Sequence, residues 1–489
     1  MKRISIDPIT RLEGHGKIEI FLDDAGEVAN VYFQIPELRG FERFCVGRPV
    51  EELARITPRI CGVCPEAHHI ASAKALDAVF GVEPAPAGRK LRELLYNTFF
   101  VTDHATHFYV LAGPDFIMGP QSEPALRNIL GVINKVGLET AGAVIKLRAE
   151  AAELISMIGG KQIHPVCALP GGVSTAITAE QRDRMLQITV GMVDFAQFTL
   201  KLFDDIVLGN SDYVDLIMSD VFTHRTYSMG LVDEQNFVNF YEGQVRVVGP
   251  DGGEFAKFNG ADYLDHIAER VEPYSYLTYP YLKNVGWKGF VDGAESGVYR
   301  ASPLSRLNAA DGMATPLAQA EYERYFATLG GKPVHQTLAT HWARLVELLY
   351  AAERAHELAT DPEIISPDVR ALPTGIVGDG VGVVEAPRGT LYHHYKCDDE
   401  GMTTAVNLIV GTTNNNAAIS MSLKKAAMGL ITGGAKVEEG TLNMIEMAFR
   451  AYDPCFGCAT HTLPGHMPLE VTVRSQTTGE VISRATRDV

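Results

Sequence analysis

The sequence predicts a helix-rich α+β fold in which both ends of the chain converge on one metal site. Apolar residues recur at helical spacing in several long segments and alternate with polar residues in shorter ones, which predicts the mixture of helices and strands. C-x-x-C pairs stand near opposite ends of the chain, at Cys61–Cys64 and Cys455–Cys458. Four thiolates at one point make a soft site for a transition metal. The pairs of a zinc ribbon lie about 12–20 residues apart, so this metal would instead join two ends of a large domain.

Composition narrows the class of protein. The chain has 489 residues, 46% hydrophobic and 21% charged, which is ordinary for a globular protein. A net charge of −17 argues against a nucleic-acid partner. No apolar run reaches about 18 residues, and no signal peptide is recognisable, so we expect no membrane span. Seven cysteines are few and odd in number, which favours a reducing, cytoplasmic compartment over a disulfide framework.

The expected elements follow in chain order. Residues 17–33 read as strand, turn and strand. Residues 141–158 are rich in helix formers, and two glycines end that helix. A capping box at residues 178–181 opens a helix that runs to about residue 208, and residues 341–358 show helical apolar spacing. Residues 210–310 read as a β-containing excursion.

The motifs around the cysteines carry a family resemblance. Arg-x-Cys-Gly-x-Cys-x-x-x-His occupies residues 59–68, and Asp-Pro-Cys-x-x-Cys-x-x-His occupies residues 453–461. Together with residues 7–15, 39–42, 385–389 and 407–410, these motifs resemble the nickel–iron hydrogenase large subunit. His164-Pro165, residues 170–173 and residues 390–395 are most similar to cytoplasmic group-3 enzymes, namely the methyl-viologen-reducing type associated with heterodisulfide reductase and the NAD-coupled bidirectional type. The resemblance implies a central helical bundle with small peripheral sheets over residues 1–461.

The resemblance also implies a ligand set for nickel and iron. Cys61, Cys64, Cys455 and Cys458 would bind nickel, and Cys64 and Cys458 would bridge to an iron that carries carbon monoxide and cyanide. On spacing alone, a structural zinc site or an iron–sulfur cluster on the same four cysteines is an open alternative.

Two further residues are expected to act on dihydrogen. Splitting dihydrogen needs an electrophilic metal, a base within reach and an exit for electrons. By resemblance, Cys455 takes the proton and Glu13 relays it, whereas the alternative for Glu13 is a salt bridge to Arg11. Arg388 would stand over the open face of the metals, where a guanidinium can bind a cyanide ligand and polarise dihydrogen.

Five more residues are expected around these groups. Asp103 and Asp453 would hold Arg388, and His68 would donate to a ligand sulfur. The alternatives are an exposed helix carboxylate, a turn initiator and a core histidine, respectively. Pro387 and Thr412 complete the expected surroundings.

A second, hard-cation site is implied near the end of the family motif. Glu42, the Leu408 carbonyl and His461 would bind magnesium, or sometimes iron. Residues 462–489 would form an extension that a maturation endopeptidase removes, and the alternative is a permanent C-terminal hairpin.

The remaining cysteines predict a partner chain. Cys45, Cys167 and Cys397 are too few for a four-cysteine cluster, and no Gly-rich dinucleotide motif follows a strand. Electrons should therefore leave through another chain. By resemblance, that chain is an iron–sulfur small subunit, with further electron-transfer subunits of the heterodisulfide-reductase or NAD-diaphorase type beyond it. Two other classes stay open: a quinone-reductase homologue, which would lack the cysteine pairs, and a hydrogen-sensing or metal-binding regulator with little turnover.

Overall fold

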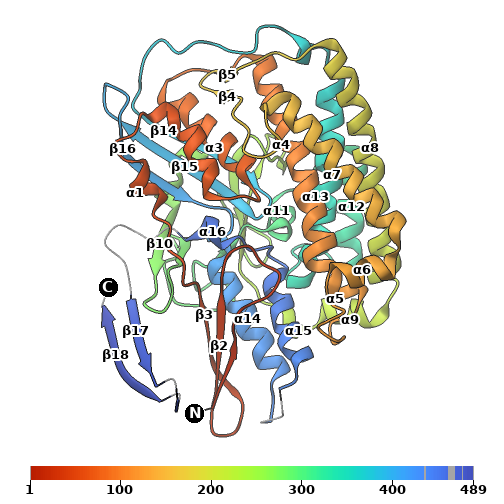
Figure 1. The fold of residues 1–489 in the computed structure, drawn as a ribbon, viewed down its shortest axis with the longest axis vertical. Coiled ribbons are helices and arrows are strands. Elements are labelled where there is room, and N and C mark those ends of the chain that lie inside the picture. The colour runs from red at the N-terminus through yellow and green to blue at the C-terminus, as the bar shows by residue number, and fades with distance from the viewer. Residues whose placement is uncertain (1, 434–436, 461–468, 476, 479, 488–489) are drawn as a thin grey trace.

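A computed structural model describes residues 2–433, 437–460, 469–475, 477–478 and 480–487. The chain begins with a three-stranded antiparallel sheet of β1 (Lys2–Ile6), β2 (Lys17–Leu22) and β3 (Val28–Gln34). Along β2, Ile18, Ile20 and Leu22 are buried while their neighbours are half-buried, which is the alternation that predicted this hairpin. Figure 1 shows the sheet at the lower end of the molecule, beside the last helices of the chain.

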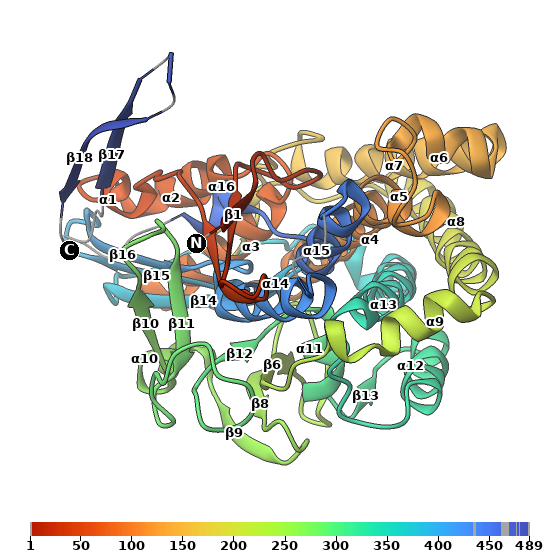
Figure 2. The same cartoon turned by 90° about the horizontal axis from the view of Figure 1, so that it is seen from below.

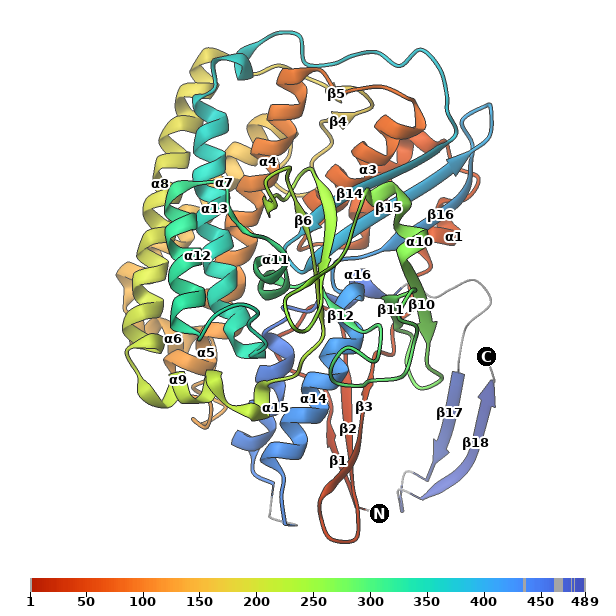
Figure 3. The same cartoon turned by 180° about the vertical axis from the view of Figure 1, so that it is seen from behind.

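Four long helices form the bundle on one side of the molecule. They are α4 (Pro86–Thr106), α7 (Leu138–Gly159), α8 (Ala179–Phe203) and α13 (Thr340–Thr360). Helix α13 packs against both α4 and α8, and α7 packs against the same two helices (Figures 1 and 3). The three predicted helices are confirmed: Thr178 and Gln181 make the capping box of α8, and α7 ends at the left-handed Gly160.

Short helices and turns connect the larger elements. Along the chain they are α1 (Phe41–Cys45), α2 (Leu53–Ile56), α5 (Gly113–Ile117), α6 (Ile129–Val136), α9 (Ser211–Met218), α10 (Tyr263–His266), α11 (Pro303–Ala309) and α12 (Pro316–Thr328). Within the described residues, no helix combines the length and the apolar character needed to cross a lipid bilayer.

Strands dominate the region for which the sequence predicts β structure. The central strands are β6 (Tyr227–Val232), β8 (Gln244–Val248) and β9 (Glu254–Phe258), joined by the two-residue strands β7 (Phe237–Val238), β12 (Tyr299–Arg300) and β13 (Gly312–Met313). A separate hairpin pairs β10 (Ile267–Val271) with β11 (Thr278–Leu282). Figure 2 shows these strands below the helical layer.

Another three-stranded sheet carries the helix that follows the first cysteine pair, in the upper left of Figure 1. Antiparallel strands β14 (Asp379–Ala386), β15 (Gly389–Cys397) and β16 (Thr403–Ile409) support α3 (Pro65–Val79). Helix and sheet approach closely because a Cβ on Gly382 would lie 2.0 Å from the Ala71 carbonyl oxygen. The helices α14 (Asn416–Leu430), α15 (Glu439–Arg450) and α16 (Phe456–Ala459) follow this sheet. One hydrophobic core joins the bundle, α3 and these last helices, and it contains both cysteine pairs.

The final hairpin pairs β17 (Leu469–Arg474) with β18 (Val481–Arg487). It projects beyond the body of the protein in Figure 2. Strands β17 and β18 thus form the hairpin that was considered for the C-terminal extension, and removal of residues 462–489 in maturation stays a prediction. The short two-residue pairing of β4 (Ala168–Leu169) with β5 (Gly172–Val173) completes the strands.

Candidate metal centre

The four cysteines of the two C-x-x-C pairs meet at one buried point. The Sγ atoms of Cys61 and Cys455 are 3.4 Å apart, as are those of Cys64 and Cys458. The Cys455 and Cys458 sulfurs are 2.9 Å apart, and all four sulfurs lie within 4.8 Å of one another. The structure thus brings both ends of the chain to a single four-sulfur site, as the spacing of the motifs predicts.

The first pair is positioned by the start of α3. Cys64 immediately precedes the helix, whose first residue is Pro65. The amide nitrogens of Val63 and Cys64 lie 3.2 and 3.3 Å from the Cys61 sulfur and donate to it. Backbone N–H groups at a helix N-terminus favour negative charge, so this loop is suited to a thiolate.

The second pair is tied to the N-terminal segment by backbone hydrogen bonds. Glu13 pairs with Cys455 as a parallel bridge, and the Phe456 amide donates to the Glu13 carbonyl at 3.0 Å. The Arg39 side chain donates to the Gly457 carbonyl at 3.2 Å and also to the Ile60 carbonyl, so one guanidinium holds both cysteine loops. Sequence reasoning gave Arg39 no role, although it begins the recognised motif at residues 39–42.

The electrostatics of the sulfurs fit a site for cations. Burial raises the pKa of Cys455 and of Cys458 well above the usual thiol value. Hydrogen bonds from the other thiols, that of Cys455 first, lower the pKa of Cys61 well below it. The protein alone therefore stabilises a thiolate at Cys61, while Cys455 and Cys458 need nearby positive charge to ionise. Bound soft transition metals supply that charge, so the donor set fits nickel and iron.

Glu13 contacts the second pair directly. Its Oε2 accepts hydrogen bonds from the Cys455 sulfur at 3.0 Å and from the Gly457 amide at 2.8 Å. Arg11 binds Asp115 at 2.5 Å instead of Glu13, so the salt bridge considered for Glu13 is not formed. The carboxylate thus lies where a proton on Cys455 can reach it.

Arg388 lies at the tip of the β14–β15 hairpin with its guanidinium between two carboxylates. Nη1 is 3.1 Å from Asp103 Oδ2, and Nη2 is 2.9 Å from Asp453 Oδ2. Asp103 is buried on α4 and is not an exposed helix carboxylate. Asp453 is also buried, with a left-handed φ of 54°. The structure therefore brings both predicted aspartates to the predicted arginine.

His68 faces a small cavity beside the cysteines. Its Nδ1 lies 3.0 Å from His393 Nε2, while its own Nε2 is buried and has no partner among the described residues. Burial lowers the pKa of His68 to about 4, so the ring is neutral. The cavity is lined by Cys64, Ala67, His68, Ala386, Arg388, Leu391, Val410, Gly411, Thr412, Cys455 and Cys458.

Thr412 and Pro387 each accept one hydrogen bond from a neighbouring residue. The Thr412 hydroxyl accepts from the Cys455 amide at 3.0 Å, which fixes the start of the second cysteine loop. The Pro387 carbonyl accepts from Arg306 at 3.1 Å.

The expected hard-cation site is partly assembled in the described residues. Glu42 Oε1 accepts from the Leu408 amide at 2.8 Å. Because the N–H and C=O of a strand residue point to the same side, the Leu408 carbonyl also faces α1. Burial, with a smaller contribution from the nearby charge of Glu269, raises the pKa of Glu42 to about 8. His461, the third expected ligand, lies outside the described residues.

Glu269 is a residue that sequence reasoning missed at this place. It lies on β10, and burial raises its pKa to about 7. A single acidic residue within a short strand is a weak signal, and only the fold reveals that it faces Glu42. The half-buried carboxyl groups of Glu42 and Glu269 and a backbone carbonyl are oxygen ligands of the kind that magnesium prefers.

Comparisons with known proteins agree with this geometry. A sequence profile described as "Nickel-dependent hydrogenase" matches residues 39–121 and 232–461, and one described as "HoxL-like" matches residues 3–38. The chain is 49% identical to an iron-sulfur subunit of the F420-non-reducing hydrogenase from Archaeoglobus profundus, over 97% of each chain. It is 39% identical to the NAD-reducing hydrogenase HoxS subunit beta of Cupriavidus necator, over 96% of this chain and 97% of that one.

A solved structure supports the same relationship in three dimensions. The chain superimposes on a NAD+-reducing [NiFe]-hydrogenase in its H2-reduced state with a TM-score of 0.86 and 37% identity. The match covers 94% of this chain and 100% of that one, so the similarity extends over the whole fold and not over the cysteine motifs alone.

Proposed function

The chain belongs to the nickel-dependent hydrogenase family as a catalytic large subunit, and on that premise we propose how its residues cleave dihydrogen. The observation that carries the proposal is the meeting of four buried cysteine sulfurs within 4.8 Å of one another. A zinc site or an iron–sulfur cluster on these cysteines would not account for the match to hydrogenases along the chain.

Cys61, Cys64, Cys455 and Cys458 would hold nickel, with Cys64 and Cys458 shared with an iron. When bound, the metal pair polarises dihydrogen and accepts its two electrons. The cavity beside Cys64 and Cys458 supports the placement of an iron with carbon monoxide and cyanide ligands, because Arg388 and His68 line it. The guanidinium is a hydrogen-bond donor suited to a cyanide nitrogen.

Cys455 and Glu13 would carry the proton away. The Cys455 sulfur takes the proton and passes it to Glu13 Oε2, which lies 3.0 Å from it. This distance is within hydrogen-bond reach, as general acid–base transfer requires. The Gly457 amide, 2.8 Å from the same oxygen, holds the carboxylate in that position.

Arg388 would stabilise charge at the open side of the centre. Asp103 and Asp453 each hold one of its terminal nitrogens, so the guanidinium is fixed before the substrate arrives. Donors fixed in advance in a buried site stabilise developing charge more strongly than donors in water do.

Glu42, the Leu408 carbonyl and His461 would bind magnesium, with Glu269 as an additional carboxylate close by. Residues 462–489 would be cut off after His461 by a maturation endopeptidase. Thr460 supports this proposal, since it is fully buried and the chain therefore leaves residue 460 from the interior of the protein.

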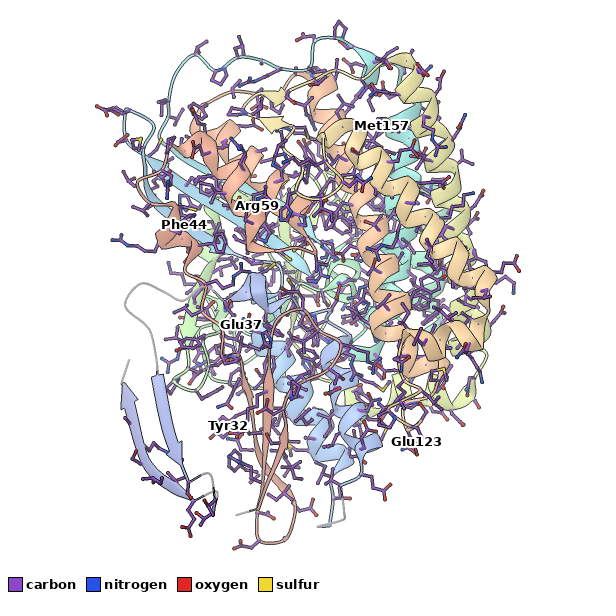
Figure 4. The ribbon with its side chains drawn as sticks, in the orientation of Figure 1. Tyr32, Glu37, Phe44, Arg59, Glu123 and Met157 are labelled. Carbon is purple, nitrogen blue, oxygen red and sulfur yellow. The ribbon has the colours of Figure 1, made fainter. Side chains whose placement is uncertain are left out.

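Electrons would leave through an iron–sulfur small subunit. Among the described residues, no further set of three or more Cys, His, Asp or Glu side chains lies close enough together to bind a metal ion, and no second cysteine cluster is formed. Val63 and Ile163, which are 42% and 60% exposed, lie beside the first cysteine pair and favour a partner there. Figure 4 shows Arg59, which precedes Cys61 by two residues, and Phe44 of α1 in the same upper left part of the view. An obligate interface of about 2,000–5,000 Å² would fit this role.

The state of the cysteines bears on the compartment of the protein, and the names of its relatives bear on the other subunits of the complex. All seven cysteines are free thiols, which supports a reducing, cytoplasmic location. The relatives named F420-non-reducing and NAD-reducing hydrogenases support further electron-transfer subunits of the heterodisulfide-reductase or NAD-diaphorase type.

Metal analysis and infrared spectroscopy of the purified complex would test this function. We expect nickel and iron near one each at the cysteine site, infrared bands of carbon monoxide and cyanide, and rapid dihydrogen uptake. Zinc in place of nickel would contradict the proposal, and a loaded centre with negligible uptake would indicate a hydrogen sensor instead.

A further inference from the structure

The hairpin tip that carries Arg388 is held from outside its own sheet by another arginine. Ala386 pairs with Gly389, which leaves Pro387 and Arg388 as the tip. Arg306 Nη1 donates to the Ala386 carbonyl at 2.9 Å, and Nη2 donates to the Pro387 carbonyl at 3.1 Å. One guanidinium therefore binds the two peptide groups immediately before Arg388.

The carbonyls on either side of these two are also bound by side chains. The Tyr96 hydroxyl donates to the Glu385 carbonyl, and Asn415 Nδ2 donates to the Arg388 carbonyl at 2.7 Å. All donors are buried. Four successive carbonyls, at residues 385–388, are thus fixed by groups from three other elements of the fold, so the tip cannot shift without breaking buried hydrogen bonds.

Arg306 is itself held in one orientation. Its Nε and Nη2 donate to the two carboxylate oxygens of Glu347, each at 2.6 Å, and its Nη1 lies 3.1 Å from Glu385 Oε2. Glu347 on α13 also lies 3.0 Å from His104 Nε2. His104 follows Asp103 on α4, so the hairpin tip and the carboxylate that binds its arginine are joined through one buried network.

We propose that Arg306 is a positioning residue for Arg388, fixing the hairpin tip so that the Arg388 guanidinium reaches Asp103 and Asp453 together. The inference rests on the proposed role of Arg388 at the metal centre. Arg306 touches none of the four cysteines, and it would act on turnover only through the position of Arg388.

The chemistry of the guanidinium explains why arginine serves here. A planar fork binds a carboxylate with two parallel hydrogen bonds and still has donors for two carbonyls, whereas a lysine ammonium has one nitrogen. Buried ion clusters are often no more stabilising than apolar packing of the same volume. We therefore infer that this cluster contributes to turnover by fixing positions and contributes little to stability. A displacement of about 1 Å at a reacting group costs about 10²-fold in rate.

A double-mutant cycle on the purified hydrogenase complex would test the proposal. Arg306→Lys is measured alone and together with Arg388→Lys, with hydrogen–deuterium exchange as the activity and nickel and iron content as the check on assembly. Arg388→Lys alone should lower exchange by about 10²-fold, the scale for losing one fixed electrostatic donor. Arg306→Lys alone should lower it by about tenfold or more, and by less than about threefold in the Arg388→Lys background, because coupled residues are not additive.

Arg92→Lys is a matched control. Arg92 is also fully buried and binds one carboxylate, that of Asp77, and two carbonyls of the β4–β5 hairpin, those of Leu169 and Gly172. That hairpin carries no residue of the metal centre. The control should lower the melting temperature but keep exchange within about threefold of the wild type in both backgrounds.

The outcomes separate this inference from the proposed function. An equal loss from Arg306→Lys in both backgrounds, or no loss with the metals retained, would overturn the positioning role alone. Wild-type exchange in Arg388→Lys would overturn the role of Arg388 and this inference with it. If Arg306→Lys fails to load nickel, Tyr96→Phe decides by the same comparison: it should lose about fivefold alone, the scale of one hydrogen bond, and nothing in the Arg388→Lys background.

Discussion

The glycine at residue 457 determines how closely the Glu13 carboxylate can approach the Cys455 sulfur. A Cβ on Gly457 would lie 2.5 Å from Glu13 Oε1, which no side chain tolerates without displacement. The glycine therefore allows the carboxylate to lie 3.0 Å from the Cys455 sulfur while the Gly457 amide donates to it. This single position couples the C-terminal cysteine loop to the N-terminal segment that supplies the acid.

The first prediction concerns Glu13. Glu13→Gln keeps the shape of the side chain but cannot carry a proton, so dihydrogen uptake and hydrogen–deuterium exchange should fall by about 10²-fold or more. Nickel and iron content should be unchanged. Glu37→Gln is the control, because Glu37 binds His15 and not a cysteine. Wild-type exchange in Glu13→Gln would mean that protons leave by another path.

The second prediction concerns the sulfur ligands. Serine replaces a soft thiolate by a hard, weakly acidic hydroxyl, so serine at any one of the four cysteines should abolish dihydrogen activity. Cys64→Ser tests this with nickel content as the direct readout. Cys397→Ser, which changes a thiol outside the centre, should keep both nickel and activity. Full activity in Cys64→Ser would remove that residue from the ligand set.

At the scale of elements, caps and apolar spacing in the sequence predicted the helices whose ends and faces depend on neighbouring residues of the chain. The capping box at Thr178 and the apolar spacing of residues 341–358 are properties of single helices, and both helices form where expected. Helix α7 begins earlier than predicted, at Leu138, because Gly137 with a φ of 91° precedes it and no capping side chain marks the start. The π-helical segment at His107–Ala112, between α4 and α5, was not predicted, since no local sequence signal encodes it.

The same distinction applies to the metal centre. The cysteines, Glu13, Arg388 and Asp453 stand in the recognised motifs and could be predicted residue by residue, whereas Asp103 stands outside them and was predicted only as a partner of Arg388. Arg306, Glu347 and Glu269 could not, because their partners come from separate segments and no spacing in the sequence relates them. Contacts of this kind become visible only when the fold brings the segments together.

The third prediction concerns the contact between α3 and its sheet. Gly382→Ala would place a Cβ 2.0 Å from the Ala71 carbonyl oxygen, so helix and strand must separate. We expect a loss of about 1–3 kcal/mol in the free energy of unfolding and a lower nickel content, because α3 begins directly after Cys64.

Gly142→Ala provides a control of opposite sign. No heavy atom lies within 4 Å of a Cβ at this position in α7, so the alanine should stabilise the helix by about 0.5–1 kcal/mol. Thermal unfolding of both variants measures the difference. A melting temperature for Gly382→Ala at or above that of the wild type would contradict the close packing.

The fourth prediction belongs to the whole molecule and concerns its mature length. Thr460 is fully buried while β17 and β18 lie outside the body, so the uncut chain must connect the interior of the protein with its outside. We expect active enzyme to end at His461. It would be about 3 kDa lighter than the 53.3 kDa chain, from the share of residues 462–489 in the 489-residue sequence.

Intact-mass measurement on enzyme purified by its activity would decide this point. A mass that includes Val489, with nickel bound and full turnover, would contradict the cleavage and leave the hydrogenase assignment standing. Partial cleavage that increases with nickel content would support the order in which metal is loaded first and the extension is removed afterwards.

The pairing of ligands from both ends has a consequence for the order of synthesis. Cys61 leaves the ribosome 394 positions before Cys455, and at about 5–20 residues per second this interval is about 20–80 s. During that time the first pair of thiols can bind zinc or another soft metal ion but cannot form the complete centre. Nickel insertion must therefore follow translation, and a chain that stops early has no place for the metal. Only a chain that has been synthesised as far as its second cysteine pair can therefore assemble the metal centre.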